Sequence, residues 1–117
     1  MISGSCHCGA VHLEIPDAPT ALTSCNCSIC RRLGGLWAYY PPADVRVTGA
    51  TATYIWGDKC LALHHCPICA CTTHWTPIGD TNPNRMGVNT RLFPVDVMSG
   101  IRVRRVDGAS DTFAELD

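Results

Sequence analysis

The sequence has no long apolar run and no excess of basic residues, and these two absences exclude several classes of protein. A membrane-spanning helix needs about 20 consecutive apolar residues, and no apolar run among the 117 residues approaches that length. The chain has 9 lysines and arginines against 10 acidic residues, whereas a nucleic-acid-binding domain carries a basic patch or stripe. We therefore expect neither a membrane protein nor a nucleic-acid-binding protein.

The first residues also lack the features of a secretory signal. Residues 1–5 have neither a positively charged start nor an apolar stretch. We therefore expect a cytoplasmic protein in a reducing compartment, where clustered cysteines are more often metal ligands than disulfide partners. The odd number of cysteines, 9, and the i, i+2 spacing of several of them also argue against a disulfide framework.

Short alternating segments predict a mainly β fold in a single domain that spans residues 1–117. Val11, Leu13 and Ile15 alternate with polar residues, which is the pattern of a half-buried strand. Other apolar or β-branched segments lie between glycine, proline and asparagine turns. These further strand candidates are residues 36–40, 45–48, 51–56, 60–65, 71–75, 85–90 and 101–104.

Helix signals are few. Residues 31–34 predict one helical turn that the Gly34–Gly35 pair ends, and residues 93–98 predict a short helical turn or a loop. The one concentration of basic residues is Arg102, Arg104 and Arg105, which alternate with apolar residues at strand spacing. We expect these three arginines to be solvated strand positions.

The cysteines are the most informative feature that the chain does have. Closely spaced thiolates bind zinc tetrahedrally from a single turn. Seven of the 9 cysteines form three clusters, namely Cys6 with Cys8, Cys25 with Cys27 and Cys30, and Cys66 with Cys69. The first and third clusters together supply the four sulfurs of a closed structural zinc site. Gly9 follows the first pair and can adopt backbone angles that let amides point toward sulfur.

The middle cluster then stands alone with three thiols. Three protein ligands leave one zinc position open, as in catalytic zinc sites. A zinc ion with three thiolates carries a formal charge of about −1 and suits a soft ligand such as a substrate thiolate. We therefore expect two zinc ions per chain, one structural and one catalytic.

A fourth side chain could instead close the middle site. The candidates are Cys60, Cys71, His64, His65 and His74. Both ions would then only stabilise the fold, and the protein would be a non-catalytic zinc-binding module for a protein partner or a thiol ligand. A further hypothesis is redox sensing by a free thiol at Cys60 or Cys71.

Five segments resemble those of one known family. They are residues 4–11 around Cys6 and Cys8, 25–31, 65–69 with 72–75, 88–91 and 106–108. In this order they resemble the glutathione-dependent formaldehyde-activating enzymes, which are grouped with the centromere protein V domain. The resemblance implies a β-tent type fold, in which small antiparallel sheets lean together around two zinc sites. Ala70 stands where the family usually has glycine, which predicts a left-handed turn strained by roughly 1 kcal/mol.

The resemblance also implies an activity and a set of site residues. Cys6, Cys8, Cys66 and Cys69 would hold the structural zinc, and Cys25, Cys27 and Cys30 the catalytic one. The implied enzyme is a carbon–sulfur lyase, similar to S-hydroxymethylglutathione synthase, acting on adducts of glutathione or a similar thiol with formaldehyde or another small aldehyde. Arg31 and Arg91 are candidate partners for glutathione carboxylates, because guanidinium forks match carboxylates. Asn89 is a candidate donor to a developing oxyanion.

Overall fold

The computed structural model describes residues 1–80 and 82–116, and within them the chain is mainly β, as expected. The strands are β1 Ile2–Ser5, β2 His12–Ile15, β3 Ala21–Cys25, β4 Trp37–Tyr40, β5 Arg46–Thr48, β6 Ala52–Tyr54, β7 Leu61–His65, β8 Thr72–Pro77, β9 Met86–Asn89, β10 Arg102–Val106 and β11 Glu115–Leu116. The helical elements are α1 Cys30–Leu33 and α2 Val95–Met98, with 3₁₀ turns η1 Pro42–Asp44 and η2 Thr90–Leu92.

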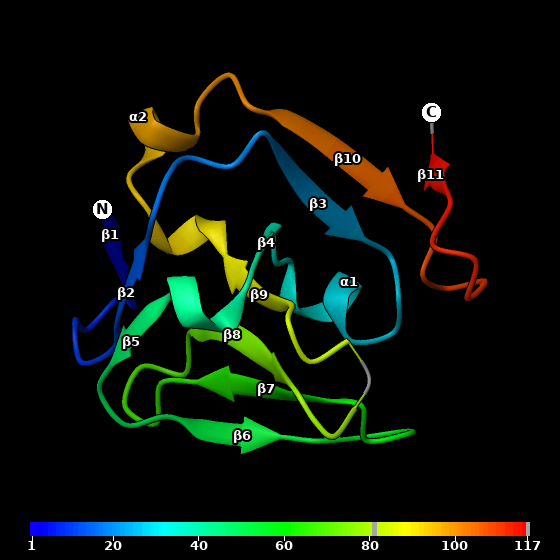
Figure 1. Ribbon diagram of the computed structural model, residues 1–117, viewed down its shortest axis with the longest axis horizontal. Helices are drawn as coiled ribbons and strands as arrows, with labels where there is room; N and C mark the ends of the chain where they lie inside the picture. Colours follow the sequence, from blue (N-terminus) through cyan, green and yellow to red (C-terminus); the bar gives the residue numbers. More distant parts are fainter. Residues whose placement is uncertain (81, 117) are drawn as a thin grey trace.

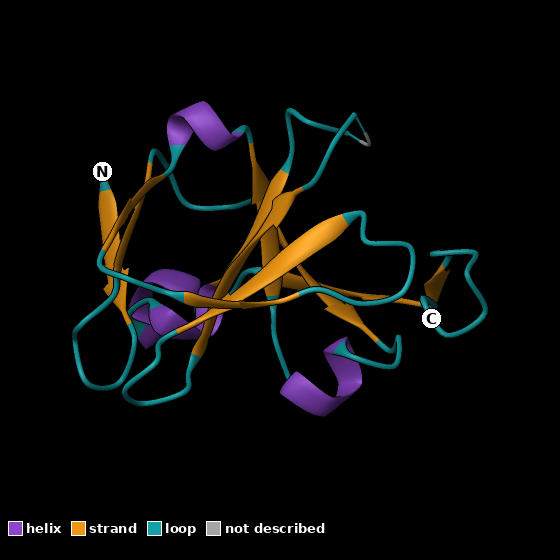
Figure 2. Ribbon diagram, turned by 90° about the horizontal axis from the view of Figure 1, so that it is seen from below, coloured by secondary structure: helices purple, strands orange, loops and turns teal. Residues whose placement is uncertain are grey.

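The strands form two sheets that lean against each other (Figures 1 and 2). The small sheet has the order β1-β2-β5, and the large sheet has the order β11-β10-β3-β4-β9-β8-β7-β6. All pairs are antiparallel except β10 with β3, which run parallel, so that Val106 pairs with Cys25. This parallel pair places the C-terminal part of the chain beside the middle cysteine cluster.

The strand candidates from the sequence are confirmed, and both expected helical turns are present as α1 and α2. The strand expected over residues 85–90 ends at Asn89, because Thr90 begins η2. Three strands, β1, β3 and β11, were not expected. Within the described ranges, no helix is long or apolar enough to cross a membrane.

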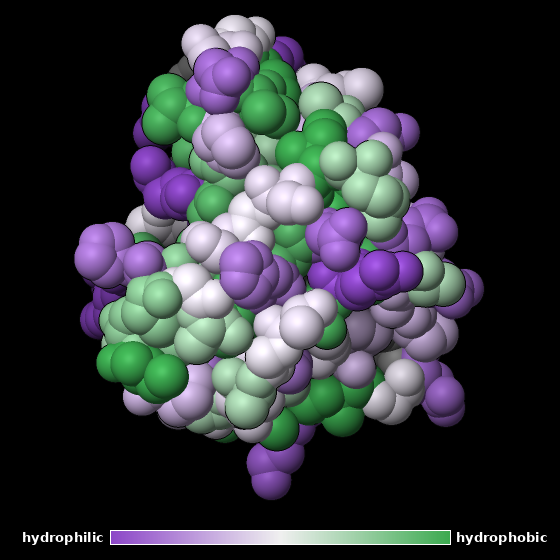
Figure 3. All heavy atoms as spheres, turned by 90° about the vertical axis from the view of Figure 1, so that its left-hand side faces the viewer, coloured by the Kyte–Doolittle hydropathy of each residue, from purple (hydrophilic) through white to green (hydrophobic). Residues whose placement is uncertain are grey.

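The core lies between the small sheet and the middle of the large one. Val11, Leu13 and Ile15 are fully buried, as their alternation predicts. Burying such a side chain contributes about 1.5–3 kcal/mol. They share a cluster with Ala38 and Tyr40 of β4, Met86 and Val88 of β9, Phe93, and two cysteines, Cys6 and Cys66. The outer face on the side of β1, β2 and β5 shows apolar and polar side chains interspersed (Figure 3).

Candidate functional site

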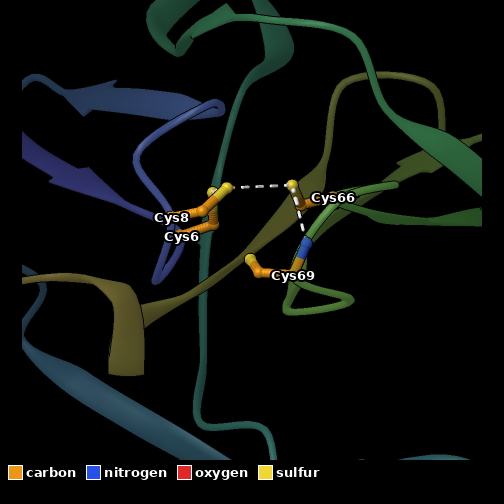
Figure 4. A group of neighbouring side chains, drawn as sticks. All are labelled: Cys6, Cys8, Cys66 and Cys69. Carbon is orange, nitrogen blue, oxygen red and sulfur yellow. Dashed lines mark hydrogen bonds between the residues drawn. The ribbon is translucent and has the colours of Figure 1, made fainter.

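The first and third cysteine clusters come together, as the sequence predicts (Figure 4). Cys6 and Cys8 lie in the loop after β1, and Cys66 and Cys69 lie in the loop between β7 and β8. The Sγ atoms of Cys6 and Cys8 are 3.7 Å apart, and those of Cys8 and Cys66 are 3.6 Å apart. Four sulfurs at about 2.3 Å from a tetrahedral ion lie roughly 3.8 Å from each other, so this four-thiol site fits zinc.

Backbone amides surround the sulfurs of the four-thiol site. The Val11 amide donates to Cys6 Sγ over 3.3 Å, and the amides of Ile68 and Cys69 donate to Cys66 Sγ over 3.4 and 3.5 Å. Hydrogen bonds to a thiolate favour its charged form. The loops are therefore folded so as to present thiolates to a cation.

The thiols of this site differ in acidity. The amides of Cys71 and Cys8 lower the pKa of Cys69 to about 5. The Ala10 amide also favours the Cys8 thiolate, but desolvation and the neighbouring Cys66 thiol outweigh it and raise the pKa of Cys8 to about 11. Neighbouring thiolates repel one another, and a bound divalent cation removes that obstacle to full ionisation.

Ala70 follows Cys69 with a φ of 66°, which confirms the left-handed turn predicted from the sequence. Its amide donates to the Cys66 carbonyl over 2.9 Å and closes the turn. This conformation is less stable by roughly 1 kcal/mol for an L-residue with a Cβ.

The middle cluster forms a second group of three thiols, called the triplet site below. Cys25 ends β3, Cys27 lies in the following turn, and Cys30 begins α1. The Cys27 amide donates to Cys25 Sγ and the Cys30 amide donates to Cys27 Sγ, each over 3.4 Å. All three thiols are half-buried, and their sulfurs lie within 4.8 Å of one another. Three converging thiolates of this kind fit a divalent zinc ion.

No fourth cysteine, histidine, aspartate or glutamate joins the triplet within residues 1–80 and 82–116. None of the alternative fourth ligands, namely Cys60, Cys71, His64, His65 and His74, belongs to this group in the described chain. Cys71 lies beside Cys69 at the four-thiol site. The rings of His64 and His74 stack 4.1 Å apart between β7 and β8.

Neither of the two thiols named for redox sensing has a lowered pKa. A reactive thiol has a lowered pKa, whereas a hydrogen bond with the Asp58 carboxylate raises the pKa of Cys60. At Cys71 the His7 amide favours the thiolate, but burial and the neighbouring Cys69 raise the pKa overall.

The turn after β10 packs directly on the triplet. Asn26 donates to Asp107 Oδ1 over 3.1 Å and accepts from the Ala109 amide over 2.8 Å. A Cβ added at Gly108 would lie 2.5 Å from Cys25 Sγ, so only glycine allows this approach. Asn26, from within the cysteine motif, thus fixes a distant segment over two of the thiols.

Trp37 supports the triplet from the protein interior. Its side chain is 1% exposed, and its indole N–H has no hydrogen-bond partner among the groups that the structure describes. The ring packs under Gly35, where an added Cβ would meet it at 2.8 Å. Burial raises the pKa of the Cys30 thiol, and the Trp37 N–H acts in the opposite direction.

A cavity of about 280 Å³ opens beside the triplet. Cys25 and Cys30 line it together with the arginines Arg31, Arg91 and Arg105. The Nε of Arg91 donates to the Gly34 carbonyl over 2.6 Å, which holds this guanidinium at the cavity wall. The structure thus brings together the triplet and both arginines that the sequence singled out, Arg31 and Arg91.

Asn89, the candidate oxyanion donor, is buried behind the cavity wall. It is 7% exposed and is absent from the cavity wall among the described residues. Its Nδ2 donates to the Thr72 carbonyl over 2.9 Å, and its Oδ1 accepts from the amides of Leu36 and Arg91. These bonds use one of the two Nδ2 hydrogens and the Oδ1 atom, and they hold the side chain inside the protein. Asn89 caps η2 and so positions Arg91, a role that asparagine often takes at a helix start.

Arg105 is a solvent-exposed strand position, as expected, but it also lines the cavity, which sequence reasoning missed. Arg102 and Arg104 both pair with Glu115 of β11. Side chains alternate between the faces of a strand, so Arg105 points the other way. Strand periodicity separates Arg105 from Arg102 and Arg104, and the pairing of β10 with β3 places Arg105 beside Ser24, another residue of the cavity wall.

Fold and thiol groups together define a small, mainly β protein with two candidate metal centres. The sequence profile described as glutathione-dependent formaldehyde-activating enzyme matches residues 1–97, and the chain belongs to this family. The resemblance seen in the sequence is thereby confirmed. A crystal structure of a Rhodobacter sphaeroides protein is also similar, with 29% sequence identity, a TM-score of 0.71, and coverage of 87% of this chain and 99% of that chain.

Proposed function

We propose that this protein is a zinc-dependent carbon–sulfur lyase acting on adducts of glutathione, or a similar thiol, with formaldehyde or another small aldehyde. The observation that carries the proposal is the triplet site, where three thiols lie beside a cavity lined by arginines and no fourth ligand joins them within the described ranges. Membership of the family supports the same reaction class.

The reaction is the reversible cleavage of a carbon–sulfur bond. In the lyase direction, the bond pair goes to sulfur, and the hydroxyl proton leaves as the aldehyde carbonyl forms. In the reverse direction, the thiolate adds to the carbonyl carbon and the oxygen takes up a proton. A zinc ion held by Cys25, Cys27 and Cys30 would supply an open position for the substrate sulfur and favour its thiolate form.

The side chains around the triplet would bind and orient the substrate. Arg31 and Arg91 lie on the cavity wall and suit carboxylates, since a guanidinium can donate two parallel hydrogen bonds. Asn26 and Gly108 keep the turn after β10 close over Cys25. Holding the thiolate and the aldehyde together in one cavity lowers the entropic barrier to their reaction.

The experiment combines binding with exchange. Glutathione is titrated into zinc-loaded protein by calorimetry, and the exchange of ¹³C-formaldehyde between its free and glutathione-bound forms is followed by NMR. We expect saturable binding and faster exchange with the wild type. Cys27→Ser should lose both together with about one zinc per chain, whereas Cys60→Ser, the matched control outside both thiol groups, should retain both. Binding without faster exchange would favour a non-catalytic thiol-binding module. If calorimetry detects no binding heat at millimolar glutathione, glutathione is excluded as the substrate.

A further inference from the structure

Trp37 contains the one buried side-chain nitrogen or oxygen that has no hydrogen-bond partner within residues 1–80 and 82–116. The whole side chain is 1% exposed, so bulk water cannot take the place of a partner. Buried polar groups in native proteins are nearly always paired, and an unpaired one indicates strain, a catalytic role or a missing ligand. The Trp37 N–H is therefore a donor for an acceptor that the folded chain alone does not supply.

The triplet contains a sulfur that lacks a donor. The Cys27 amide donates to Cys25 Sγ and the Cys30 amide donates to Cys27 Sγ, so two of the three sulfurs have a backbone partner. In the part of the chain that the structure describes, no backbone amide donates to Cys30 Sγ. Burial raises the pKa of the Cys30 thiol, and a hydrogen bond to its thiolate would offset that effect.

The sheet places Trp37 on the same side as the triplet. Trp37 of β4 pairs with Thr23 of β3, and Cys25 lies two residues further along β3. Directly paired residues, and alternate residues of one strand, point their side chains to the same face of a sheet. The indole and the Cys25 thiol therefore share a face.

Gly35 lets the indole approach the cavity wall. A Cβ added at Gly35 would lie 2.8 Å from the Trp37 ring and 3.3 Å from its Nε1, so a larger residue would displace the indole. Gly35 and Cys30 both line the cavity. The Trp37 N–H also counteracts the rise that burial causes in the pKa of Cys30, which requires the two groups to be neighbours. The donor without an acceptor thus lies near the sulfur without a backbone donor.

We propose that the Trp37 indole N–H donates a hydrogen bond to the Cys30 thiolate when the triplet holds a metal ion, which makes Trp37 a positioning residue for this ligand. The inference rests on the proposed function only in that it requires a metal ion at the triplet. A hydrogen bond draws electron density from the sulfur and makes the thiolate a weaker nucleophile. Cys30 would then remain a metal ligand in a cavity that admits an electrophilic aldehyde.

The first test is NMR of the full chain with ¹⁵N-labelled tryptophan and with ¹¹³Cd in place of zinc. The chain has three tryptophans, and the spectra of Trp56→Phe and Trp75→Phe assign their indole signals. In the wild type, only the Trp37 N–H should lie downfield and show scalar coupling to ¹¹³Cd through the hydrogen bond. In Cys27→Ser, which should lose the ion at the triplet, the coupling should disappear and the signal should move upfield. A role of Trp37 in packing alone would produce neither effect.

The second test removes the donor. Trp37→Phe retains an aromatic ring and should bind zinc at the triplet about 10- to 100-fold more weakly, the usual effect of losing the partner of a metal ligand. Trp56→Phe is the matched control, because Trp56 is engaged in a stack with Tyr54 of β6, and it should leave the zinc affinities of both sites unchanged. Competition with a chromophoric chelator measures these affinities.

The outcomes separate this inference from the proposed function. If the triplet of the wild type holds cadmium and the Trp37 signal shows neither the coupling nor the downfield shift, the inference is overturned and the proposed function stands. An unchanged zinc affinity of the triplet in Trp37→Phe has the same consequence. If the wild type takes up no metal at the triplet, the proposed function is overturned as well. The NMR test uses no Trp37 variant, so it decides the question even if Trp37→Phe does not fold.

Discussion

Two cysteine pairs share one local backbone pattern. They are Cys66 with Cys69, between β7 and β8, and Cys27 with Cys30, at the start of α1. In each pair the amide of the second cysteine donates to the sulfur of the first, over 3.5 and 3.4 Å. The two pairs differ in the part of the protein that lies opposite their sulfur atoms. Two more thiols, those of Cys6 and Cys8, complete the first group, whereas an arginine-lined cavity opens beside the second. The same turn thus serves a closed or an open site, depending on the segment packed opposite.

The two sites also differ in how they join the core. Cys6 and Cys66 are 2% and 0% exposed and belong to the main apolar cluster, whereas the triplet thiols are half-buried. In Figure 1 the β1–β2 loop lies at the left and the connection from β3 to α1 at the right. An ion at the four-thiol site would therefore tie the small sheet to the large one, whereas an ion at the triplet would hold only the surface beside the cavity.

Removing one thiol from each site should give the largest difference between the four-thiol site and the triplet site. Cys66→Ser should abolish cooperative folding at 25 °C, because a structural zinc contributes about 10 kcal/mol or more, as much as the whole stability of a small domain. Cys27→Ser should retain the fold and lose about one zinc per chain. Thermal unfolding by circular dichroism and zinc analysis measure both outcomes, with Cys60→Ser as the control. A folded Cys66→Ser protein, or an unfolded Cys27→Ser protein, would contradict the division of roles.

Acid should weaken the part of the sheet that carries the four-thiol site. Burial, followed by the neighbouring His64, lowers the pKa of His74 to about 3. The unfolded chain binds a proton at this histidine near pH 6.5, so the neutral ring stabilises the fold fully above pH 6.5. That stability is lost as pH falls from 6.5 toward 3, by at most about 1.4 kcal/mol per pH unit.

Urea unfolding at several pH values between 7.5 and 5 measures this loss. His74→Phe removes the titrating ring and should flatten the slope of stability against pH by about one proton relative to the wild type. His12→Phe, at an exposed position of β2, is the matched control and should keep the wild-type slope. Thiolate protonation contributes to all three proteins, so the difference between slopes isolates His74. Equal slopes in the wild type and His74→Phe would show that the buried pair is not a source of acid sensitivity.

The sequence was sufficient for the four-thiol site because its ligands occur in short motifs with strict spacing. Local alternation likewise predicted β2, where Leu13 and Ile15 form one buried face with Val11, which lies just before the strand. It did not predict β3, which pairs in parallel with the distant β10 and has only five residues, ALTSC, with a half-polar pattern. Parallel pairing over such a separation leaves no turn signal in the sequence.

The cavity was harder to predict than the thiols, because tertiary packing decides which arginines reach it. Arg31 and Arg91 were singled out from their motifs, and both line the cavity. Strand periodicity distinguishes Arg105 from Arg104, but the cavity beside Arg105 could not be predicted before the neighbours of β10 were known. Asn89 was assigned to the substrate, yet its amide bonds to Thr72, Leu36 and Arg91. A motif therefore marks a position as constrained without saying whether it binds or supports.

Gly108→Ala should perturb the triplet and leave the four-thiol site intact. Its new Cβ would meet Cys25 Sγ at 2.5 Å and the Cys27 Cβ at 2.9 Å, so the turn or the thiols must move. We expect zinc at the triplet to bind about 10- to 100-fold more weakly, the usual effect of disturbing the surroundings of metal ligands. Gly57→Ala, where nothing lies within 4 Å of an added Cβ, should leave both zinc affinities unchanged. Competition with a chromophoric chelator measures the two affinities, and equal weakening at both sites would contradict their independence.

The smallest expected effect has the opposite sign and concerns the turn of the four-thiol site. Ala70 adopts a φ of 66°, and the left-handed residue that follows the triplet helix is Gly34, with a φ of 67°. Ala70→Gly should therefore relieve the strain that only the four-thiol turn carries and stabilise the protein by about 1 kcal/mol. Differential scanning calorimetry should show this as a rise of about 4 °C in Tm. Ala109→Gly, in a turn where alanine has a negative φ, should give no rise, because glycine there only adds freedom to the unfolded chain. If Ala70→Gly lowers Tm as well, the four-thiol turn holds its left-handed residue without strain, and the two cysteine turns are closer in energy than their sequences indicate.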